Sequence, residues 1–245
     1  MNTDTLQQAR IDLAAALRLA VRFGFNEGIC NHFSYMVPGT QDHFLINPQG
    51  FHWSEITAGS LVLMDSEGNV IEGDAPAEPT AFFIHSRIHL GLPHARCVLH
   101  THMPYATALT ALENGRLEPI SQTALGFYER VAYDDDYNGL ALDAEEGDRI
   151  TRALDNKYVL FLANHGVVVI GPDLGQAFND LYYLERACQL QVLAMSTGQP
   201  LRRVSAQMAT KTARQFVSPE NQAQVAAHFT ALKRLLDRDE PDYQH

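Results

Sequence analysis

Residues 97–104 read CVLHTHMP, a short apolar run that ends in His-x-His. Successive side chains of a β-strand point to opposite faces, so His100 and His102 are predicted on the same face. Two imidazoles one strand repeat apart can reach a single metal ion, although surface or core histidines would give the same pattern. Pro104 cannot donate to a ladder of backbone hydrogen bonds and should end the strand. The pair is therefore predicted at a strand end, where α/β sheets usually carry their chemistry.

The length suits one large α/β domain or two small ones, and the lack of a linker favours one domain over residues 1–245. Hydrophobic residues make up 46% of the 245 residues, which is enough for a sizeable core. We find no internal repeat, low-complexity linker or break in composition. The 29 acidic residues outnumber the 18 Lys and Arg residues, for a formal net charge of -11. This balance argues against nucleic acid or an anionic membrane surface as a partner, and it is ordinary for an acidic cytosolic protein.

The cysteines and the N-terminal segment indicate a cytoplasmic protein. Cys30, Cys97 and Cys188 show no CxxC spacing, and we expect reduced, packed thiols. The first 20 residues carry Asp4 and Asp12 and lack the basic start of a signal peptide. No apolar run approaches the roughly 18 residues of a membrane span.

Hydrophobic periodicity predicts alternating groups of strands and helices. Predicted strands cover 32–37, 43–47, 60–65, 70–72, 97–102, 158–163 and 167–171. Predicted helices cover 3–24, 79–91, 104–113, 144–156, 174–197, 205–216 and 219–236. The closely spaced early strands favour an antiparallel or mixed sheet. Residues 119–137 give no clear pattern, and the polar tail 237–243 is expected to fray.

A third histidine follows another buried strand. His165 lies in an Asn-His-Gly turn between two apolar runs, and a buried histidine needs a partner for both ring nitrogens. With His100 and His102 it makes three neutral imidazoles, the ligand number of a catalytic metal site with an open position. Glu78, at the start of helix 79–91, is a candidate fourth ligand or general base. It could equally be an electrostatic partner of the helix dipole.

Other polar residues have weaker signals. Asn31 lies at a loop–strand junction, where its amide could serve a ligand or stabilise the turn. His32 is interpreted as structural. His85 and His89 have chelating i, i+4 spacing but no matching ligand set near them in sequence, so we interpret them as packing or surface residues. The acidic run at 134–136 is interpreted as a solvated loop.

Four motifs together resemble the class II aldolase/adducin family. They are GICNHFS at 28–34, INPQG at 46–50, Glu78 with the downstream VLHTH at 98–102, and ANHG at 163–166. The resemblance spans about residues 8–200. It implies an α/β class with a three-layer α/β/α fold around a central mixed, largely antiparallel sheet.

The resemblance also implies roles for the polar residues. The family's metal-binding histidines match His100, His102 and His165, and its catalytic glutamate, described both as ligand and as base, matches Glu78.

Family members are typically homotetramers with active sites at subunit interfaces, where a tyrosine of the neighbouring subunit often donates a proton. Tyr128 is our candidate for that tyrosine, and Tyr133 competes with it. Asn31, Gln49 and Gly50 are the matching candidates for substrate binding.

Departures from the family pattern bear on the substrate. Sugar-phosphate aldolases of the family usually have two Ser or Thr residues where this chain has Pro76 and Ala77. A hydroxyl residue is also usual where this turn reads Pro48-Gln49, and Cys30-Asn31 replaces the usual Gly-Asn pair. The lost donors would remove much of the bonding to a phosphate. We therefore expect a small, non-phosphorylated hydroxy- or oxo-acid as the substrate.

The implied function is a divalent-metal-dependent carbon–carbon lyase of aldolase type, acting through a metal-stabilised enediolate. Zn is expected first, and Mn, Fe or Co is compatible with three imidazoles. One alternative is a decarboxylase of an aromatic or hydroxy acid, and another is a non-haem iron oxygenase. A non-enzymatic alternative is an adducin-like binding or scaffold module. The adducins lack the metal-binding histidines that this chain keeps.

Overall fold

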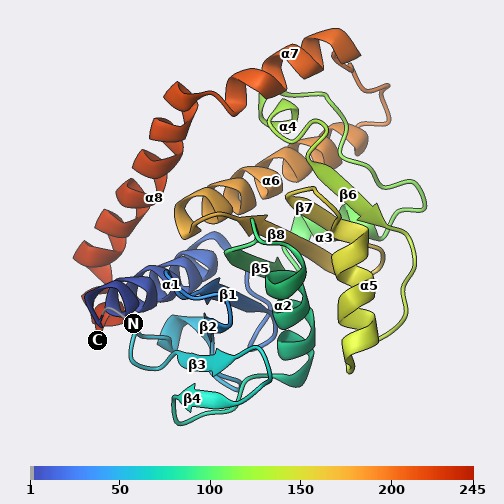
Figure 1. Cartoon of the computed structure of the whole chain (residues 1–245). Coiled ribbons are helices and arrows are strands. Elements are labelled where there is room, and N and C mark those ends of the chain that lie inside the picture. Colours follow the sequence, from blue (N-terminus) through green and yellow to red (C-terminus); the bar gives the residue numbers. More distant parts are fainter. Residues whose placement is uncertain (1–2) are drawn as a thin grey trace.

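One eight-stranded sheet runs through the computed structural model, which describes residues 3–245 (Figure 1). The strand order is β4-β3-β2-β1-β5-β8-β7-β6. Only β6 and β7 pair in parallel within this sheet, so the predicted mixed, largely antiparallel sheet is confirmed. The strands are β1 (His32–Met36), β2 (His43–Ile46), β3 (Val62–Asp65), β4 (Val70–Glu72), β5 (Cys97–Thr101), β6 (Val131–Asp134), β7 (Val159–Leu162) and β8 (Gly166–Gly171).

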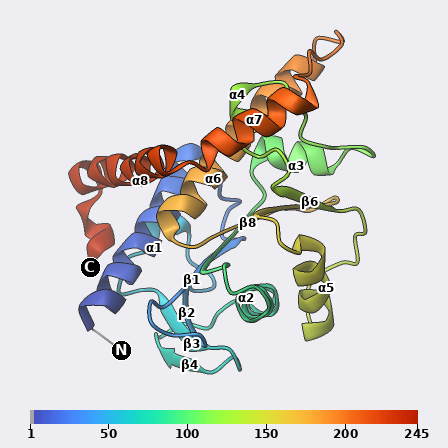
Figure 2. The same ribbon diagram turned by 45° about the horizontal axis from the view of Figure 1, so that its top comes forward.

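Helices cover both faces of the sheet and complete the three predicted layers. The α-helices are α1 (Thr3–Phe23), α2 (Pro79–Gly91), α3 (Pro104–Thr110), α4 (Gln122–Leu125), α5 (Ala144–Leu154), α6 (Leu174–Met195), α7 (Ala206–Phe216) and α8 (Pro219–Asp239). Two short 3-10 helices are η1 (Trp53–Glu55) and η2 (Pro241–Gln244). Helices α1, α6 and α8 lie on one face, and α2 and α5 lie on the other (Figure 2). None of the helices described here is both long and apolar enough to cross a membrane.

Alternation along β5 decides which face carries the site. Cys97 and Leu99 belong to the core beneath α1 and α6. Val98 belongs to the core beneath α2 and α5. His100 follows Val98 by two residues and therefore faces the α2 layer.

Strand pairing brings the distant histidine segments together at one end of the central strands. β5 pairs with β8 so that Thr101 lies opposite Val167, directly after the turn that carries His165. The two backbones approach closely at Gly166, where an added Cβ would lie 2.5 Å from the Thr101 carbonyl oxygen and 2.7 Å from His102 Cδ2. The turn between β7 and β8 therefore needs a glycine at this position.

The segment without a clear pattern contains two short elements, α4 and β6. β6 is the edge strand beside β7 and is mostly half-buried. Asp134 at its end is buried and forms an ion pair with Arg149 at 2.6 Å. The interpretation of residues 134–136 as a solvated loop is therefore wrong for Asp134, because the strand turns its carboxylate toward α5.

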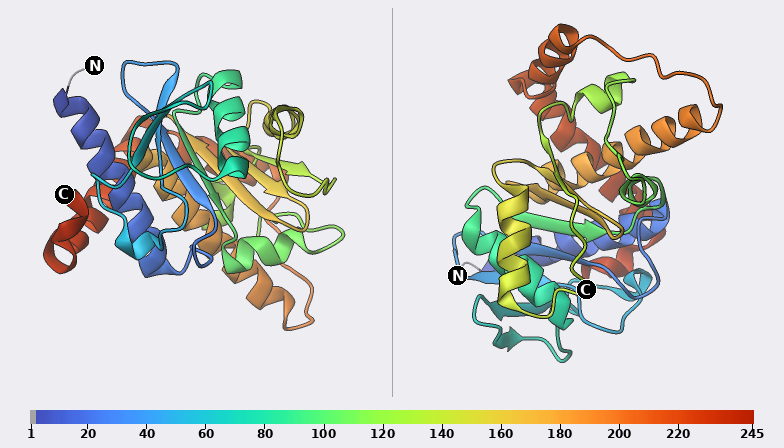
Figure 3. Two further views of the ribbon diagram at one scale, coloured as in Figure 1. Left: turned by 90° about the horizontal axis from the view of Figure 1, so that it is seen from below. Right: turned by 90° about the vertical axis from the view of Figure 1, so that its right-hand side faces the viewer.

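The prediction of a frayed C-terminal tail is wrong. Tyr243 is only 1% exposed, and its hydroxyl donates to Asp237 at 2.7 Å. The Ala58 amide donates to the Tyr243 carbonyl at 2.8 Å. The ring is buried in the core beside α1, and its burial outweighs the polar character of the neighbouring residues. Figure 3 shows this end of the chain from two further sides.

The cysteines are free thiols of two kinds. Cys97 and Cys188 are buried, as predicted, and burial raises the pKa of both thiols well above the usual value. Cys30 is exposed, in contrast to the expected packing. It lies in the turn before β1, where its side chain has no core to enter.

Candidate metal centre

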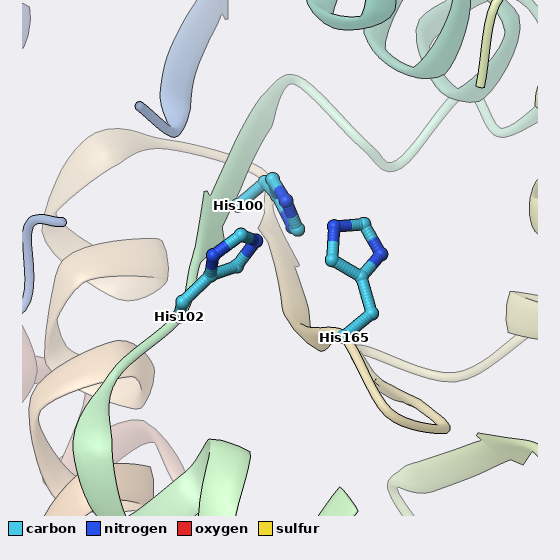
Figure 4. A group of neighbouring side chains, drawn as sticks. All are labelled: His100, His102 and His165. Atoms are coloured by element: carbon cyan, nitrogen blue, oxygen red, sulfur yellow. The ribbon is translucent and has the colours of Figure 1, made fainter. Parts of the chain in front are cut away.

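Three histidines converge where the central strands β5 and β8 meet, at the end of β5 and the start of β8 (Figure 4). His100 lies in β5, His102 directly follows that strand, and His165 lies in the β7–β8 turn. Each residue offers a potential ligand atom, and these atoms all lie within 4.8 Å of one another. The ring centroids are 4.8 to 5.1 Å apart. This arrangement can hold one metal ion between three imidazoles.

His100 is fixed in the tautomer that suits a metal ligand. Its Nδ1 donates to the carbonyl oxygen of Val167 at 3.0 Å, so Nε2 keeps its lone pair. Burial, followed by the nearby His165, holds the pKa of His100 well below the usual value. The ring is therefore neutral and able to bind a cation through Nε2.

His102 has an orphaned ring nitrogen. Its Nδ1 forms a short hydrogen bond with the carboxylate of Glu27. Its Nε2 is buried and has no hydrogen-bond partner among the described residues. A buried polar atom of this kind calls for a partner, and a metal ion supplies one. The carboxylate–histidine pair is the arrangement that orients a ligand for a metal.

Glu27 was missed by the sequence analysis. Its partner His102 is 75 residues away along the chain, and the contact is created by the turn in which Glu27 bridges Cys30. The only sequence signal is the position of Glu27 directly before the glycine of the GICNHFS motif.

His165 is a second candidate ligand whose ring is kept neutral. Burial, followed by the proximity of His102, lowers the pKa of His165 to about 4. His100 and His165 are thus uncharged near neutral pH, as metal ligands must be. Three imidazoles suit Zn and are also compatible with Mn, Fe or Co.

Glu78 lies at the edge of this centre. It is the N-cap of α2, where its Oε2 accepts a hydrogen bond from the Ala81 amide at 2.8 Å and a short one from the Thr80 hydroxyl. The same oxygen lies 4.0 Å from His32 Nε2, and the His32 ring packs against His100. In the described chain Glu78 is not part of the ligand group that shares the 4.8 Å spacing. The placement suits a group that acts beside the metal.

Asn31 supports the centre and keeps a free donor. It has a left-handed backbone with φ of 73°, which is uncommon for a non-glycine residue. Its Oδ1 accepts from the backbone amide of His102 at 3.3 Å. Its Nδ2 is buried without a partner in the part of the chain that the structure describes. The side chain thus holds the His102 backbone and offers one N–H to a ligand.

The other predicted substrate-binding residues lie in an exposed turn. Gln49 and Gly50 are both exposed, and Gly50 has φ of 85°. The Gln49 amide donates to the Pro76 carbonyl at 3.0 Å. This bond fixes the turn beside the segment that leads into Glu78.

The two candidate tyrosines have different surroundings. Tyr128 follows α4, and no contact in the described structure joins its side chain to the three histidines. The Tyr133 hydroxyl accepts from the Leu117 amide at 3.0 Å, and its ring stacks on Phe161. Tyr133 therefore acts in packing, whereas Tyr128 is left without a role inside one subunit.

The two histidines of α2 are buried. Of the two interpretations given for His85 and His89, packing is confirmed and a place on the surface is wrong. Both lie on hydrogen-bond paths with Ser34 of β1, and His85 also contacts His32. Their i, i+4 spacing places them on one helix face. Their partners His32 and Ser34 are two residues apart and share one face of β1.

A cavity of about 760 Å³ lies away from the metal centre. It is lined by residues of α4, α6, α7 and α8, and an ion pair between Arg130 and Asp180 at 2.6 Å borders it. None of the predicted site residues lines it. This cavity is therefore separate from the three-histidine group.

Two related proteins align with most of this chain. A protein of Caulobacter vibrioides, assigned by its name to aldolase class 2, is 38% identical over 237 residues and covers 96% of this chain and 91% of its own. Alpha-adducin of Rattus norvegicus is 39% identical over 192 residues, which are 77% of this chain and 26% of that protein.

Two solved structures share the fold. An aldolase II superfamily protein of Pseudomonas syringae superposes with a TM-score of 0.92 at 37% identity, over 98% of this chain and 96% of that one. L-fuculose 1-phosphate aldolase of Glaciozyma antarctica has a TM-score of 0.86 at 27% identity, over 98% and 92% of the two chains. The family model of the class II aldolase and adducin N-terminal domain matches residues 11–192. With this match over most of its length, the chain belongs to the class II aldolase and adducin family.

Proposed function

We propose that this protein is a divalent-metal-dependent carbon–carbon lyase of aldolase type. The observation that carries the proposal is the orphaned Nε2 of His102, which lies in the group with His100 and His165. Glu78 reaches this group through His32, which lies 4.0 Å from its carboxylate and packs against His100. A scaffold has no use for a buried, unpaired ring nitrogen, whereas a metal centre needs one.

The residues of the site can divide the chemistry as follows. A divalent cation held by His100, His102 and His165, with Zn expected first and Mn, Fe or Co as alternatives, would supply the Lewis acidity that stabilises an enediolate. Glu78 exchanges a proton with the substrate carbon.

The remaining candidates bind substrate or handle its second proton. The free amide N–H of Asn31 donates to a substrate oxygen. Gln49 and Gly50, in their exposed turn, contact the substrate as it enters the site. Tyr128 of a neighbouring subunit exchanges a proton with the departing fragment.

The substrate is proposed to be a small, non-phosphorylated hydroxy- or oxo-acid. Pro76 and Ala77 offer no hydroxyl before Glu78, and the Pro48-Gln49 turn offers none either. A phosphate would lose those charge-assisted bonds. One structural neighbour is named for a sugar-phosphate substrate, and these positions are the reason to expect a different substrate class here.

The proposal is tested by proton exchange in D2O. Hydroxypyruvate carries a carboxylate, a carbonyl and a hydroxyl, so loss of a C3 proton gives an enediolate. Proton NMR of hydroxypyruvate incubated with the zinc-loaded protein in D2O should show loss of the C3 proton signal as deuterium enters C3. Glu78→Gln should abolish the exchange while the protein keeps its zinc.

Two comparisons sharpen the test. Metal-stripped protein should not exchange, and equal exchange in the stripped or Glu78→Gln protein would contradict the proposal. Dihydroxyacetone phosphate serves as the phosphorylated probe. Exchange with that probe and not with hydroxypyruvate would contradict the substrate class and leave the role of Glu78 intact.

We further propose a cytoplasmic homotetramer in which residues 1–245 form one domain and each site is completed by a neighbouring subunit. Tyr128→Phe and Glu78→Gln proteins should each be inactive alone. Mixed oligomers formed from both should regain activity, because some interfaces combine an intact Glu78 with an intact Tyr128. No recovery on mixing would show that both residues act within one subunit.

A second candidate is an adducin-like binding module. The specific observation in its favour is the 39% identity with alpha-adducin over 192 residues. A protein that binds no divalent cation when titrated would support this alternative and contradict the lyase.

A further inference from the structure

A buried chain of hydrogen bonds runs from the edge of the metal centre into the layer between the sheet and α2. His32 Nδ1 in β1 lies 2.7 Å from His85 Nε2 in α2. His85 Nδ1 lies 2.5 Å from Ser34 Oγ, and the same hydroxyl lies 2.7 Å from His89 Nε2. The chain ends where His89 Nδ1 lies 2.7 Å from the carbonyl oxygen of Ala95. All four side chains are buried.

The carbonyl at the end fixes the direction of every bond in the chain. A carbonyl only accepts, so His89 Nδ1 carries its proton and His89 Nε2 is an acceptor. The Ser34 hydroxyl then donates to His89, and its oxygen accepts from His85 Nδ1. His85 Nε2 is left to accept the Nδ1 proton of His32. Among the described contacts no carboxylate touches His85 or His89, so a charged ring there would be unpaired and costly.

His32 therefore presents an unprotonated Nε2 toward Glu78. This atom lies 4.0 Å from Glu78 Oε2. Pairing of β1 with β5 places His32 opposite His100, and the two ring centroids are 4.9 Å apart. At this distance Glu78 makes no hydrogen bond to His32, and its Oε2 accepts from Ala81 and Thr80 instead.

We propose that His32 is a positioning residue for Glu78, held as a hydrogen-bond acceptor by His85, Ser34 and His89. The inference rests on the proposed function. A substrate C–H bond breaks, its electron pair stays on the substrate as the enediolate, and the proton forms an O–H bond on Glu78. That O–H donates to His32 Nε2 after the carboxyl has moved about 1 Å, which brings the pair to normal hydrogen-bond distance.

The opposite tautomer would have the opposite effect. An Nε2–H on His32 would donate to the ionised carboxylate of Glu78 and favour its charged form. The lone pair instead stabilises the carboxylic acid that forms when Glu78 takes a proton. The chain to Ala95 selects the second case, because it places the proton of His32 on Nδ1.

Neutron diffraction from crystals of the perdeuterated, zinc-loaded protein tests the tautomer directly. We expect deuterium on Nδ1 of His32, His85 and His89, and none on His32 Nε2. Deuterium on His32 Nε2 would overturn the inference. This readout does not depend on any substrate.

Exchange kinetics test the consequence. Ser34→Ala breaks the chain without touching Glu78 or the metal histidines, and should lower kcat for deuterium exchange into hydroxypyruvate about tenfold, with KM and zinc content unchanged. Ser34→Thr keeps the hydroxyl and should restore kcat. Ser86→Ala removes another buried hydroxyl, in α2 but outside this chain of hydrogen bonds, and should leave kcat unchanged. A Ser34→Ala protein with wild-type kcat would overturn the positioning role. If the wild-type protein exchanges neither probe, the proposed function fails, and the neutron map still decides the tautomer.

Discussion

At the scale of single residues, the two ring nitrogens of His102 have different surroundings. One of its ring nitrogens is held by Glu27, and the other is buried without a partner in the described chain. The period of two along residues 97–102 predicted that His100 and His102 share a face, and the Asn-His-Gly turn between two apolar runs pointed to His165. Glu27 could not be predicted in this way, because it lies 75 residues from His102 in the sequence and reaches it through the turn before β1.

The first prediction concerns Glu27. Glu27→Gln removes the negative charge that orients His102 and strengthens it as a ligand. Zinc affinity, measured by competition with a chromophoric chelator, should fall about tenfold or more. Glu67→Gln, at an exposed turn between β3 and β4, should leave the affinity unchanged. Equal affinities in the two variants would remove Glu27 from the metal centre.

At the scale of elements, local periodicity located most helices and strands because each has one buried face. β6 has no such pattern, since it is a half-buried edge strand whose place is set by its parallel pairing with β7. The tail after α8 is polar in sequence, and it is held by the burial of Tyr243 beside α1 and by ion pairs of Arg18 with Glu240 and Asp242. Both features depend on contacts between elements, which a local pattern does not contain.

The second prediction concerns the contact between β5 and the β7–β8 turn. Gly166→Ala would press a methyl group against the Thr101 carbonyl and the His102 ring. We expect at least about tenfold weaker zinc binding, because displaced imidazoles no longer point at one ion. Overpacking should also lower the free energy of unfolding by about 1–3 kcal/mol. Gly175→Ala, inside α6, should change neither quantity by a comparable amount. Wild-type zinc binding in Gly166→Ala would show that this approach does not position His102.

The third prediction concerns the C-terminal element. Tyr243→Ala empties a buried aromatic site and should lower the free energy of unfolding by about 3 kcal/mol in urea. Tyr137→Ala removes a ring that is 54% exposed and should have a much smaller effect. Equal effects of the two substitutions would mean that the tail does not stabilise the fold.

At the scale of the whole molecule, the layer between the sheet and α2 is unusual because it buries neutral histidines. Burial is the largest cause that lowers the pKa of His89, to about 4. The unfolded chain takes up this proton near pH 6.5. The folded pKa is the lower one, so the stabilising contribution is complete above pH 6.5 and is lost as the pH falls toward 4.

The fourth prediction follows from this difference. Between pH 7 and pH 5 the free energy of unfolding of the wild-type protein should fall by about 2 kcal/mol more than that of His89→Gln. Urea unfolding with a chelator in both samples removes the contribution of bound metal, and the other histidines contribute equally to both proteins. Parallel pH profiles for the two proteins would show that His89 is not kept neutral by the fold.

The central claim is that His100, His102 and His165 bind a catalytic divalent cation, and calorimetric titration of metal-free protein with zinc tests it most directly. The account predicts one cation per chain, and at least about hundredfold weaker binding in His102→Ala. The matched control is His43→Ala, since His43 Nδ1 also lies 2.6 Å from a carboxylate, that of Asp42, but outside the cluster. His43→Ala should bind zinc like the wild type. Absence of binding to the wild type, or equal binding in His102→Ala and His43→Ala, would contradict the account.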